Sequence, residues 1–243
     1  MSEFKFPTEE IELPSKGLIY PKDNPLSSGK VEVKYMTAKE EDILSNQSFI
    51  QKGVVLDKLL KSVIIDKDIN IDDLIVGDKN ALLIATRVLG YGKDYHISVN
   101  GADYTIDMTT LEHKDIDDST FVRGENEFPF TTPSTGTVLT YKLATGKIEK
   151  QIDREIAGLK KINKENSSEL TTRLKYLISS VDGDSETKTI REFVDYRFLA
   201  RDSRAFREHI NATQPDVNLN YVLDNGEEAL IPIGINFFWP DYK

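Results

Sequence analysis

Apolar and polar residues alternate in two short stretches of the chain, residues 31–35 and residues 139–143. This alternation puts every second side chain on one side of the backbone, so each stretch predicts a strand with one buried face. Elsewhere apolar residues recur at the i, i+3, i+4, i+7 spacing that is typical of an amphipathic helix. Residues 56–64, 147–161 and 170–181 predict three such helices, whose apolar stripes face a core.

A threonine stands at the start of the first helix that follows each predicted strand. Thr37 and Glu40 have the spacing of a capping box, in which the two residues satisfy each other's backbone N–H groups. Thr145 lacks this partner because Ile148 occupies the corresponding position, so we expect only half of the device there.

Two aspartates and two turns mark the later part of each half. Asp78 and Asp202 are expected to be helix N-caps, because a carboxylate stabilises the positive end of a helix. Asn100-Gly101 predicts a type I′ hairpin turn. This turn would pair Val99 with Ala102, Ile97 with Tyr104 and Tyr95 with Ile106. A second, less regular hairpin is expected over residues 217–223 and 229–233.

Several short strings recur in the chain in the same order. They pair residues 14–17 with 133–136, 31–41 with 139–149, 78–82 with 202–206, and 100–101 with 225–226. Ordered self-similarity indicates a degenerate duplication. We therefore predict an α+β fold of two degenerate tandem strand–helices–β-hairpin repeats with a short linker. The expected segments are an N-terminal extended arm (1–30), a first repeat (31–110), a linker with an edge strand (111–136), and a second repeat with an aromatic C-terminal tail (137–243).

Composition narrows the classes of function. Of the 243 residues, 41 are acidic and 31 are basic, which gives a net charge of −10. Nucleic-acid binding needs Lys and Arg to neutralise phosphates, so none is expected. Cysteine is absent, which excludes disulfides and thiolate chemistry. Neither a signal peptide nor an apolar stretch near the ~20 residues of a membrane span is evident, so we expect a cytoplasmic protein without a membrane anchor.

The sequence offers little that could carry catalysis. Its three histidines, His96, His113 and His209, do not have the i, i+4 spacing of a metal-binding helix. Asp115, Asp117 and Asp118 lack the glycine turn and distal glutamate of a calcium loop, and are interpreted as a solvated acidic loop. We expect a protein that is not an enzyme, with no catalytic residues, cofactor or metal.

Two aromatic or apolar segments are candidates for a protein interface. Tyr and Trp are enriched at interface hot spots, and the last residues of the chain hold four aromatic side chains, including the only Trp. The alternative is that this tail packs on its own domain. The candidate interface residues are Ile11, Leu13, Leu18 and Tyr20 near the N-terminus, and Phe237, Phe238, Trp239 and Tyr242 near the C-terminus.

Several strings resemble a family of T4-like bacteriophage baseplate proteins, which includes baseplate hub and hub assembly proteins. They are IELPSKGLIYP (11–21), YMTAKEEDIL (35–44), LDKLL (56–60), DSRAFREH (202–209), and the ending from PDV (215–217) to FFWP (237–240). The resemblance covers nearly the whole chain.

The resemblance implies a non-enzymatic structural or assembly protein of the baseplate hub of a contractile-tailed phage. Such a protein would bind other baseplate and hub proteins, in the host cytoplasm during assembly and in the tail baseplate of the virion. Formation of a homo-oligomer is left open. The alternatives are a cytoplasmic acidic adaptor or chaperone-like module, and a small hydrolase with an unrecognised site.

Overall fold

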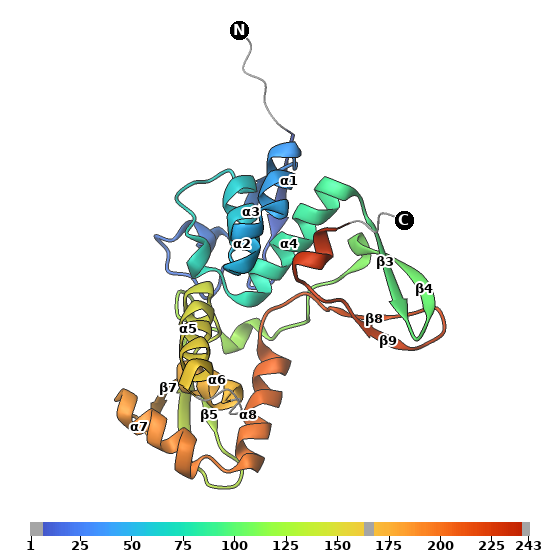
Figure 1. Cartoon of the computed structure of the whole chain (residues 1–243). Coiled ribbons are helices and arrows are strands. Elements are labelled where there is room, and N and C mark those ends of the chain that lie inside the picture. Colours follow the sequence, from blue (N-terminus) through green and yellow to red (C-terminus); the bar gives the residue numbers. More distant parts are fainter. Residues whose placement is uncertain (1–6, 163–167, 240–243) are drawn as a thin grey trace.

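The computed structural model describes residues 7–162 and 168–239 of the chain. Helices and several small antiparallel sheets make an α+β protein, as predicted. Figure 1 shows one group of helices, α1 to α4, near the N-terminus and a second group, α5 to α8, below it. Two β-hairpins, β3–β4 and β8–β9, lie beside each other at one side of the molecule.

The first half begins with a hairpin that sequence patterning missed. β1 (Thr8–Glu12) pairs antiparallel with β2 (Lys30–Lys34), with Ile11 opposite Val31. The expected extended arm over residues 1–30 is therefore wrong for its described part. The remaining elements are α1 (Ala38–Ser45), α2 (Gln47–Gln51), α3 (Val55–Val63), α4 (Val76–Tyr91), β3 (Asp94–Val99) and β4 (Ala102–Asp107).

The predicted hairpin at Asn100-Gly101 is confirmed. All three expected residue pairs are found between β3 and β4, from Tyr95 opposite Ile106 to Val99 opposite Ala102. Both turn residues have positive φ angles, 53° at Asn100 and 83° at Gly101, as a type I′ turn requires. The capping box is also confirmed, because the Glu40 carboxylate accepts from the Thr37 N–H at 2.9 Å.

The second half is built on a three-stranded antiparallel sheet of order β5-β6-β7. Its elements are β5 (Phe128–Thr131), β6 (Val138–Tyr141), α5 (Gly146–Ile162), α6 (Glu169–Leu177), β7 (Ile178–Val181), α7 (Thr187–Glu192), a π-helical turn (Phe193–Arg197), α8 (Ala200–Thr213), β8 (Asn220–Val222), β9 (Glu228–Leu230) and the 3-10 turn η6 (Ile235–Phe238). β5 is the predicted edge strand. Ile178 and Val181 belong to β7 instead of the expected helical stripe, because their backbone pairs with β6.

The two halves share their order of elements. Each has a hairpin, then helices, a segment that returns to the second strand of the hairpin, a long helix and a final hairpin. In the first half this returning segment is a single bridge between Ile64 and Val33, and in the second it is the strand β7. Duplication as the origin of this order stays a prediction.

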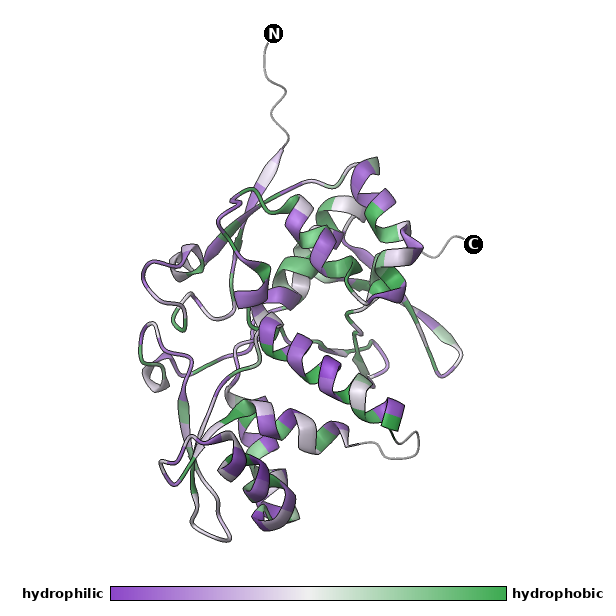
Figure 2. Ribbon diagram, turned by 60° about the vertical axis from the view of Figure 1, so that its left-hand side comes forward, coloured by the Kyte–Doolittle hydropathy of each residue, from purple (hydrophilic) through white to green (hydrophobic). Residues whose placement is uncertain are grey.

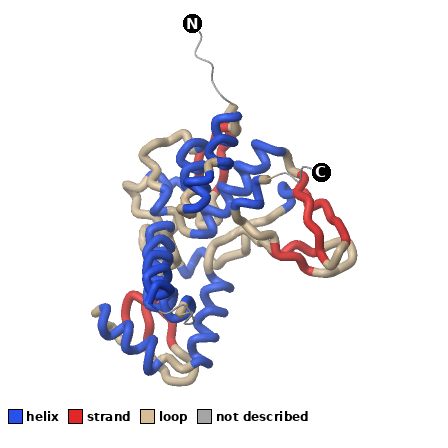
Figure 3. The backbone as a smooth tube through the Cα atoms, in the orientation of Figure 1, coloured by secondary structure: helices blue, strands red, loops and turns tan. Residues whose placement is uncertain are grey.

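The connection between the halves is mostly loop. Between β4 and β5 the chain forms only two 3-10 turns, Met108–Thr110 and Asp118–Thr120 (Figure 3). The buried apolar residues of both halves nevertheless form one continuous cluster. α5 is amphipathic, and its apolar and polar residues follow different sides of the ribbon (Figure 2).

Candidate functional site

Two of the four N-terminal candidate interface residues, Leu13 and Tyr20, belong to the core of the first half. They are only 1% and 4% exposed, whereas Ile11 and Leu18 are half-buried. The prediction of an interface is wrong for Leu13 and Tyr20 and stays a prediction for Ile11 and Leu18. The reason for the burial is the β1–β2 hairpin, which draws the loop between its strands over α4 and gives its apolar side chains an internal site.

Asp78 anchors this loop from α4. Its Oδ1 accepts the Ser15 N–H at 2.9 Å, and its Oδ2 accepts the Ser15 hydroxyl and the Tyr20 hydroxyl, both at 2.6 Å. The N-cap of α4 is Ile75, so the expectation that Asp78 is an N-cap is wrong. Its carboxylate instead turns away from its own helix end to satisfy donors of the hairpin loop.

Asp202 holds the corresponding loop of the second half. Its Oδ1 accepts the Ser134 N–H at 2.8 Å, and its Oδ2 accepts the Thr135 hydroxyl at 3.1 Å. Leu199 is the N-cap of α8, so the N-cap expectation is wrong here as well. In both halves, an aspartate in the first turn of the long helix binds the connection of the opening hairpin.

Ser15, Tyr20 and Asp78 form a buried group, which we call the Asp78 cluster. Burial shifts the pKa values of Asp78 and Tyr20. Burial raises the pKa of Asp78 to about 6, although the hydrogen bonds from Ser15 and Tyr20 act in the opposite direction. Burial also raises the pKa of Tyr20 well above its usual value, and the neighbouring Asp78 charge adds to this. Ser15 and Asp78 have no exposed surface, so a substrate has no access to them. The cluster is structural.

The aromatic C-terminal residues are also mostly internal. Phe237 and Phe238 are 1% and 0% exposed, so they are not an interface, and the self-packing alternative holds for them. Arg87 of α4 fixes this segment, because its Nε donates to the Phe237 carbonyl at 3.0 Å. Trp239 remains 41% exposed, and Tyr242 lies outside the described residues.

Backbone carbonyl groups hold the Arg87 guanidinium. It donates to the Gly92 carbonyl at 2.9 Å and to the Asp94 carbonyl at 3.1 Å. The guanidinium carbon also lies 5.1 Å from the centre of the Tyr95 ring and 5.6 Å from that of Phe237. Carbonyl dipoles and aromatic faces thus stabilise a buried cation, and burial lowers its pKa.

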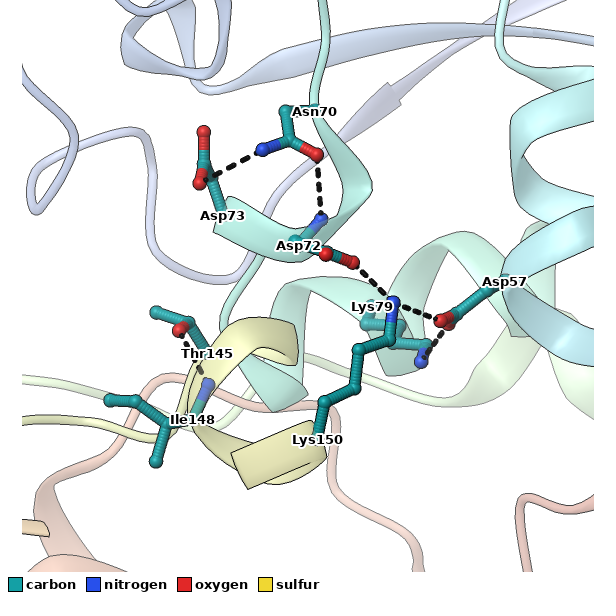
Figure 4. Close-up of polar contacts among 8 residues, drawn as sticks. All are labelled: Asp57, Asn70, Asp72, Asp73, Lys79, Thr145, Ile148 and Lys150. Atoms are coloured by element: carbon teal, nitrogen blue, oxygen red, sulfur yellow. Dashed lines mark hydrogen bonds and ion pairs between the residues drawn. The ribbon is translucent and has the colours of Figure 1, made fainter. Parts of the chain in front are cut away.

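An ion-pair network joins the two halves. Lys150 of α5 contacts Asp57 of α3 at 2.7 Å and also pairs with Asp72, while Lys79 of α4 contacts Asp57 at 2.5 Å (Figure 4). Figure 4 also shows the half cap predicted at Thr145, whose Oγ1 accepts the Ile148 N–H. The beginning of α5 is therefore fixed against the first half.

Backbone contacts strengthen this junction. The Val76 N–H donates to the Ala144 carbonyl at 3.0 Å, and the Gly146 N–H donates to the Leu74 carbonyl at 2.9 Å. A Cβ atom at Gly146 would lie only 3.1 Å from the Ile71 carbonyl oxygen, so any larger residue would require a small shift of the backbone at this contact.

A cleft of about 560 Å³ lies beside the junction, and its charged groups largely pair with one another. Lys79 and Lys150 line it within the network just described. Arg173 contacts Glu149 through two hydrogen bonds of 2.5 and 3.0 Å. Because these ions satisfy each other, the cleft does not present a converging set of one charge for a substrate.

The projecting turn, residues 195–199, carries two exposed large side chains of the second half. Tyr196 is 85% exposed and Leu199 is 51% exposed. The turn is nevertheless fixed, because Phe198 stacks on Phe193 with ring centres 4.9 Å apart and Asp195 pairs with Lys175 at 2.6 Å. Its first three residues belong to the π-helical turn Phe193–Arg197, and such turns are frequent at functional sites.

The sequence pattern did not predict the projecting turn. The signal was present in the run from Phe193 to Leu199, which holds more apolar and aromatic residues than one short helical face can bury. The periodicity of apolar residues identifies the positions that a helix buries. Apolar residues that stay exposed are recognised only once the fold is known.

The histidines do not assemble into a metal site. His96 contacts the Thr105 hydroxyl at 2.9 Å, and the His209 ring lies 5.1 Å from that of Phe130. Burial lowers the pKa of His113 and of His209. Within residues 7–162 and 168–239, no group of three or more His, Asp and Glu side chains is placed to bind a metal ion.

No match to a known protein identifies the function of this chain. No helix in the described part of the chain is both long enough and apolar enough to cross a membrane. The chain matches no protein-family model, no curated protein and no solved structure. Its function must therefore be argued from its own residues.

Proposed function

We propose that this chain is a non-enzymatic structural or assembly protein of the baseplate hub of a contractile-tailed, T4-like phage. It would act by binding other baseplate and hub proteins, in the host cytoplasm during assembly and in the tail baseplate of the virion. The proposal combines the family resemblance with one structural observation, the rigid exposure of Tyr196 and Leu199 on the projecting turn.

A rigid exposed aromatic residue suits protein binding. Tyr and Arg are enriched among the residues that dominate interface energies, and Tyr196 and Arg197 are neighbours here. Because Phe198 and Asp195 already hold the turn, binding costs little additional conformational entropy. The exposed Leu199 extends the apolar surface. These features support a prearranged docking site for another protein.

The polar groups that could have suggested catalysis have structural roles. Ser15, Tyr20 and Asp78 form an enclosed cluster that fixes a loop, and Lys150 joins the two halves. These observations favour a binding protein over the hydrolase alternative.

The test is co-purification from cells that produce the tagged chain together with the hub proteins of the same phage. Tyr196→Ala and Leu199→Ala should each reduce the recovery of a hub subunit. Substitutions at exposed positions usually change stability by no more than about 0.5 kcal/mol, so thermal melts should remain close to the wild type. Val122→Ala is the matched control, because Val122 is 58% exposed but lies outside the turn.

Two results would contradict the proposal. Wild-type chain that recovers no hub protein would remove the assignment to the hub. Equal recovery by all three variants would leave a hub protein but exclude the projecting turn as its docking site. Mass spectrometry of purified particles then separates a permanent virion component from an assembly factor that leaves.

A further inference from the structure

The two hairpins lie beside each other at one side of the molecule (Figure 1), and a groove lies between them. It has a volume of about 860 Å³, and its lining includes every residue of β3 and every residue of β9. The hairpin tips meet at one end, where Asn225 Nδ2 donates to the Tyr104 hydroxyl at 2.8 Å. Asn236 and Trp239 line the groove as well. We call this feature the strand groove.

Alternate residues of β3 have backbone N–H and C=O groups that point away from β4. The Met108 N–H donates to the Lys93 carbonyl at 2.9 Å, so the backbone groups of Lys93 face β4. In an antiparallel pair these directions alternate along the strand, so the backbone N–H and C=O groups of Asp94, His96 and Ser98 point outward. The sheet has two strands, and in the described part of the chain no third strand pairs with this edge.

One edge of β9 likewise faces away from β8, the strand with which it pairs. The Leu223 N–H donates to the Glu227 carbonyl at 2.8 Å, and the Ile231 N–H donates to the Leu219 carbonyl at 2.9 Å. By the same alternation, the backbone groups of Leu230 point away from β8. The groove is thus lined by two strands that each have an outward-facing edge.

Beyond its first residue, the edge of β3 lacks the protection found on other edge strands of this chain. Proteins block strand edges with proline or charged side chains to prevent unwanted pairing. β5 has Pro129 within it, and three of the five residues of β1 are glutamates. Of the outward positions of β3, only the first, Asp94, is charged, and its carbonyl accepts a hydrogen bond from Arg87. His96 and Ser98 leave the rest of this edge without a proline or a carboxylate. This contrast favours an edge that is kept open for pairing.

The lining also indicates the side chains of the partner. Leu230 is 67% exposed and Trp239 is 41% exposed, and both line the groove. In a strand, alternate side chains point to the same face. A segment with apolar residues at alternate positions would cover these two side chains, and basic residues between them would suit the acidic Asp94 and Glu228.

We infer that the strand groove binds an extended segment of a partner protein as an additional β-strand beside β3. The six residues of β3 span about 20 Å, which sets the length of the added strand. Main-chain hydrogen bonds supply affinity in this mode, and alternate side chains supply specificity. The partner is a hub protein of the kind proposed above, so the inference rests on the proposed function and specifies its partner.

The test uses short overlapping peptides that cover the hub proteins of the phage, titrated against the full chain. Ser98→Pro removes an outward N–H of β3 and leaves the β3–β4 hydrogen bonds intact. Asp103→Pro is the matched control, because Asp103 lies opposite Ser98 and its N–H points outward from β4. We expect peptides with alternating apolar residues to bind the wild type and Asp103→Pro equally, and Ser98→Pro about tenfold more weakly.

Amide hydrogen exchange gives an independent measurement on the wild-type chain. A bound peptide should slow exchange at His96 and Ser98, and methylation of alternate peptide N–H groups should abolish the effect. This measurement tests strand addition on the wild-type chain, so it holds even if Ser98→Pro lowers the melting temperature more than Asp103→Pro does.

Several results would overturn the inference. Equal peptide binding by the two proline variants, with unchanged exchange at His96 and Ser98, excludes the strand groove. If hub proteins co-purify but none of their peptides binds, the groove fails while the proposed function stands. If no hub protein co-purifies, both fail. Protection of the same amides in concentrated chain alone, together with dimerisation, would assign the edge to a second copy.

Discussion

Ser15 holds Asp78 through both its backbone N–H and its hydroxyl, at 2.9 and 2.6 Å, although 63 positions separate the two residues in the sequence. Ser134 and Asp202 repeat the backbone part of this contact at 2.8 Å. In each half, a single carboxylate therefore connects the loop of the opening hairpin to the beginning of the long helix. This connection fixes the hairpin over the helix.

The Asp78 cluster should make stability depend on pH. Burial raises the pKa of Asp78 to about 6, compared with ~3.9 in an unfolded chain. Between these values the folded protein binds more protons, so the contribution of Asp78 to stability falls as the pH rises from about 4 to about 6. Urea unfolding should show this slope in the wild type and lose it in Asp78→Asn. An unchanged slope would exclude Asp78 as its source.

Glu40 should give the opposite dependence at lower pH. Burial acts to raise its pKa, but hydrogen bonds from Lys34, Ser62 and Thr37 lower it to about 2. The folded state therefore binds fewer protons below the unfolded value of ~4.3, and stability is lost as the pH falls towards 2. Unfolding of Glu40→Gln should lack this loss. Parallel pH profiles for wild type and variant would refute the prediction.

The capping box should appear as energetic coupling. Thr37→Ala should reduce the free energy of unfolding by about 1 kcal/mol, because one helix end loses its cap. Glu40→Ala removes the other half of the same device, so the double variant should cost less than the sum of the single ones. Strictly additive effects in chemical denaturation would contradict the assignment.

The C-terminal segment should behave as core. Phe237→Ala should lower the free energy of unfolding by about 3–5 kcal/mol, because Phe237 is buried against Tyr95. Arg87→Lys should also destabilise, since an ammonium group cannot reach three carbonyls and two ring faces together. Trp239→Ala, at a more exposed position, is the control and should change the melting temperature much less. A full-stability Phe237→Ala would overturn this interpretation.

The junction between the halves should depend on Lys150. Lys150→Met removes the cation that contacts Asp57 and Asp72 and leaves two carboxylates near each other. We expect a lower melting temperature and earlier proteolysis in the linker. Lys147→Met is the control, because Lys147 is an exposed neighbour on the same helix that forms no ion pair with any residue the structure describes. Equal effects of the two substitutions would mean that the network does not hold the junction.

Local signals in the sequence located much of the fold. The turn at Asn100-Gly101 and the capping box at Thr37 were predictable because each depends on residues close together in the chain. The hairpin β1–β2 was not predictable in this way, since 17 residues separate its strands. Its strand β1 also carries three glutamates, which hides the alternation that usually marks a strand.

The same difference between local signals and long-range contacts limited the functional predictions. An apolar or aromatic run shows that a residue needs a covered environment, but not whether its own chain or another protein covers it. Phe237 and Tyr20 find that cover through Arg87 and Asp78, which lie far from them in the sequence. Tyr196 does not, and only the folded arrangement distinguishes the two cases.

The contact between Arg87 and Phe237 has a consequence for the biogenesis of the protein. A ribosome adds Phe237 150 residues after Arg87, so the first half cannot close its core while the chain is still short. Contacts of such separation slow folding, because a long loop must be ordered before they form. The nascent first half would therefore expose the site for Phe237 and Phe238 throughout most of its synthesis. Its final closure comes only when the second half has been made.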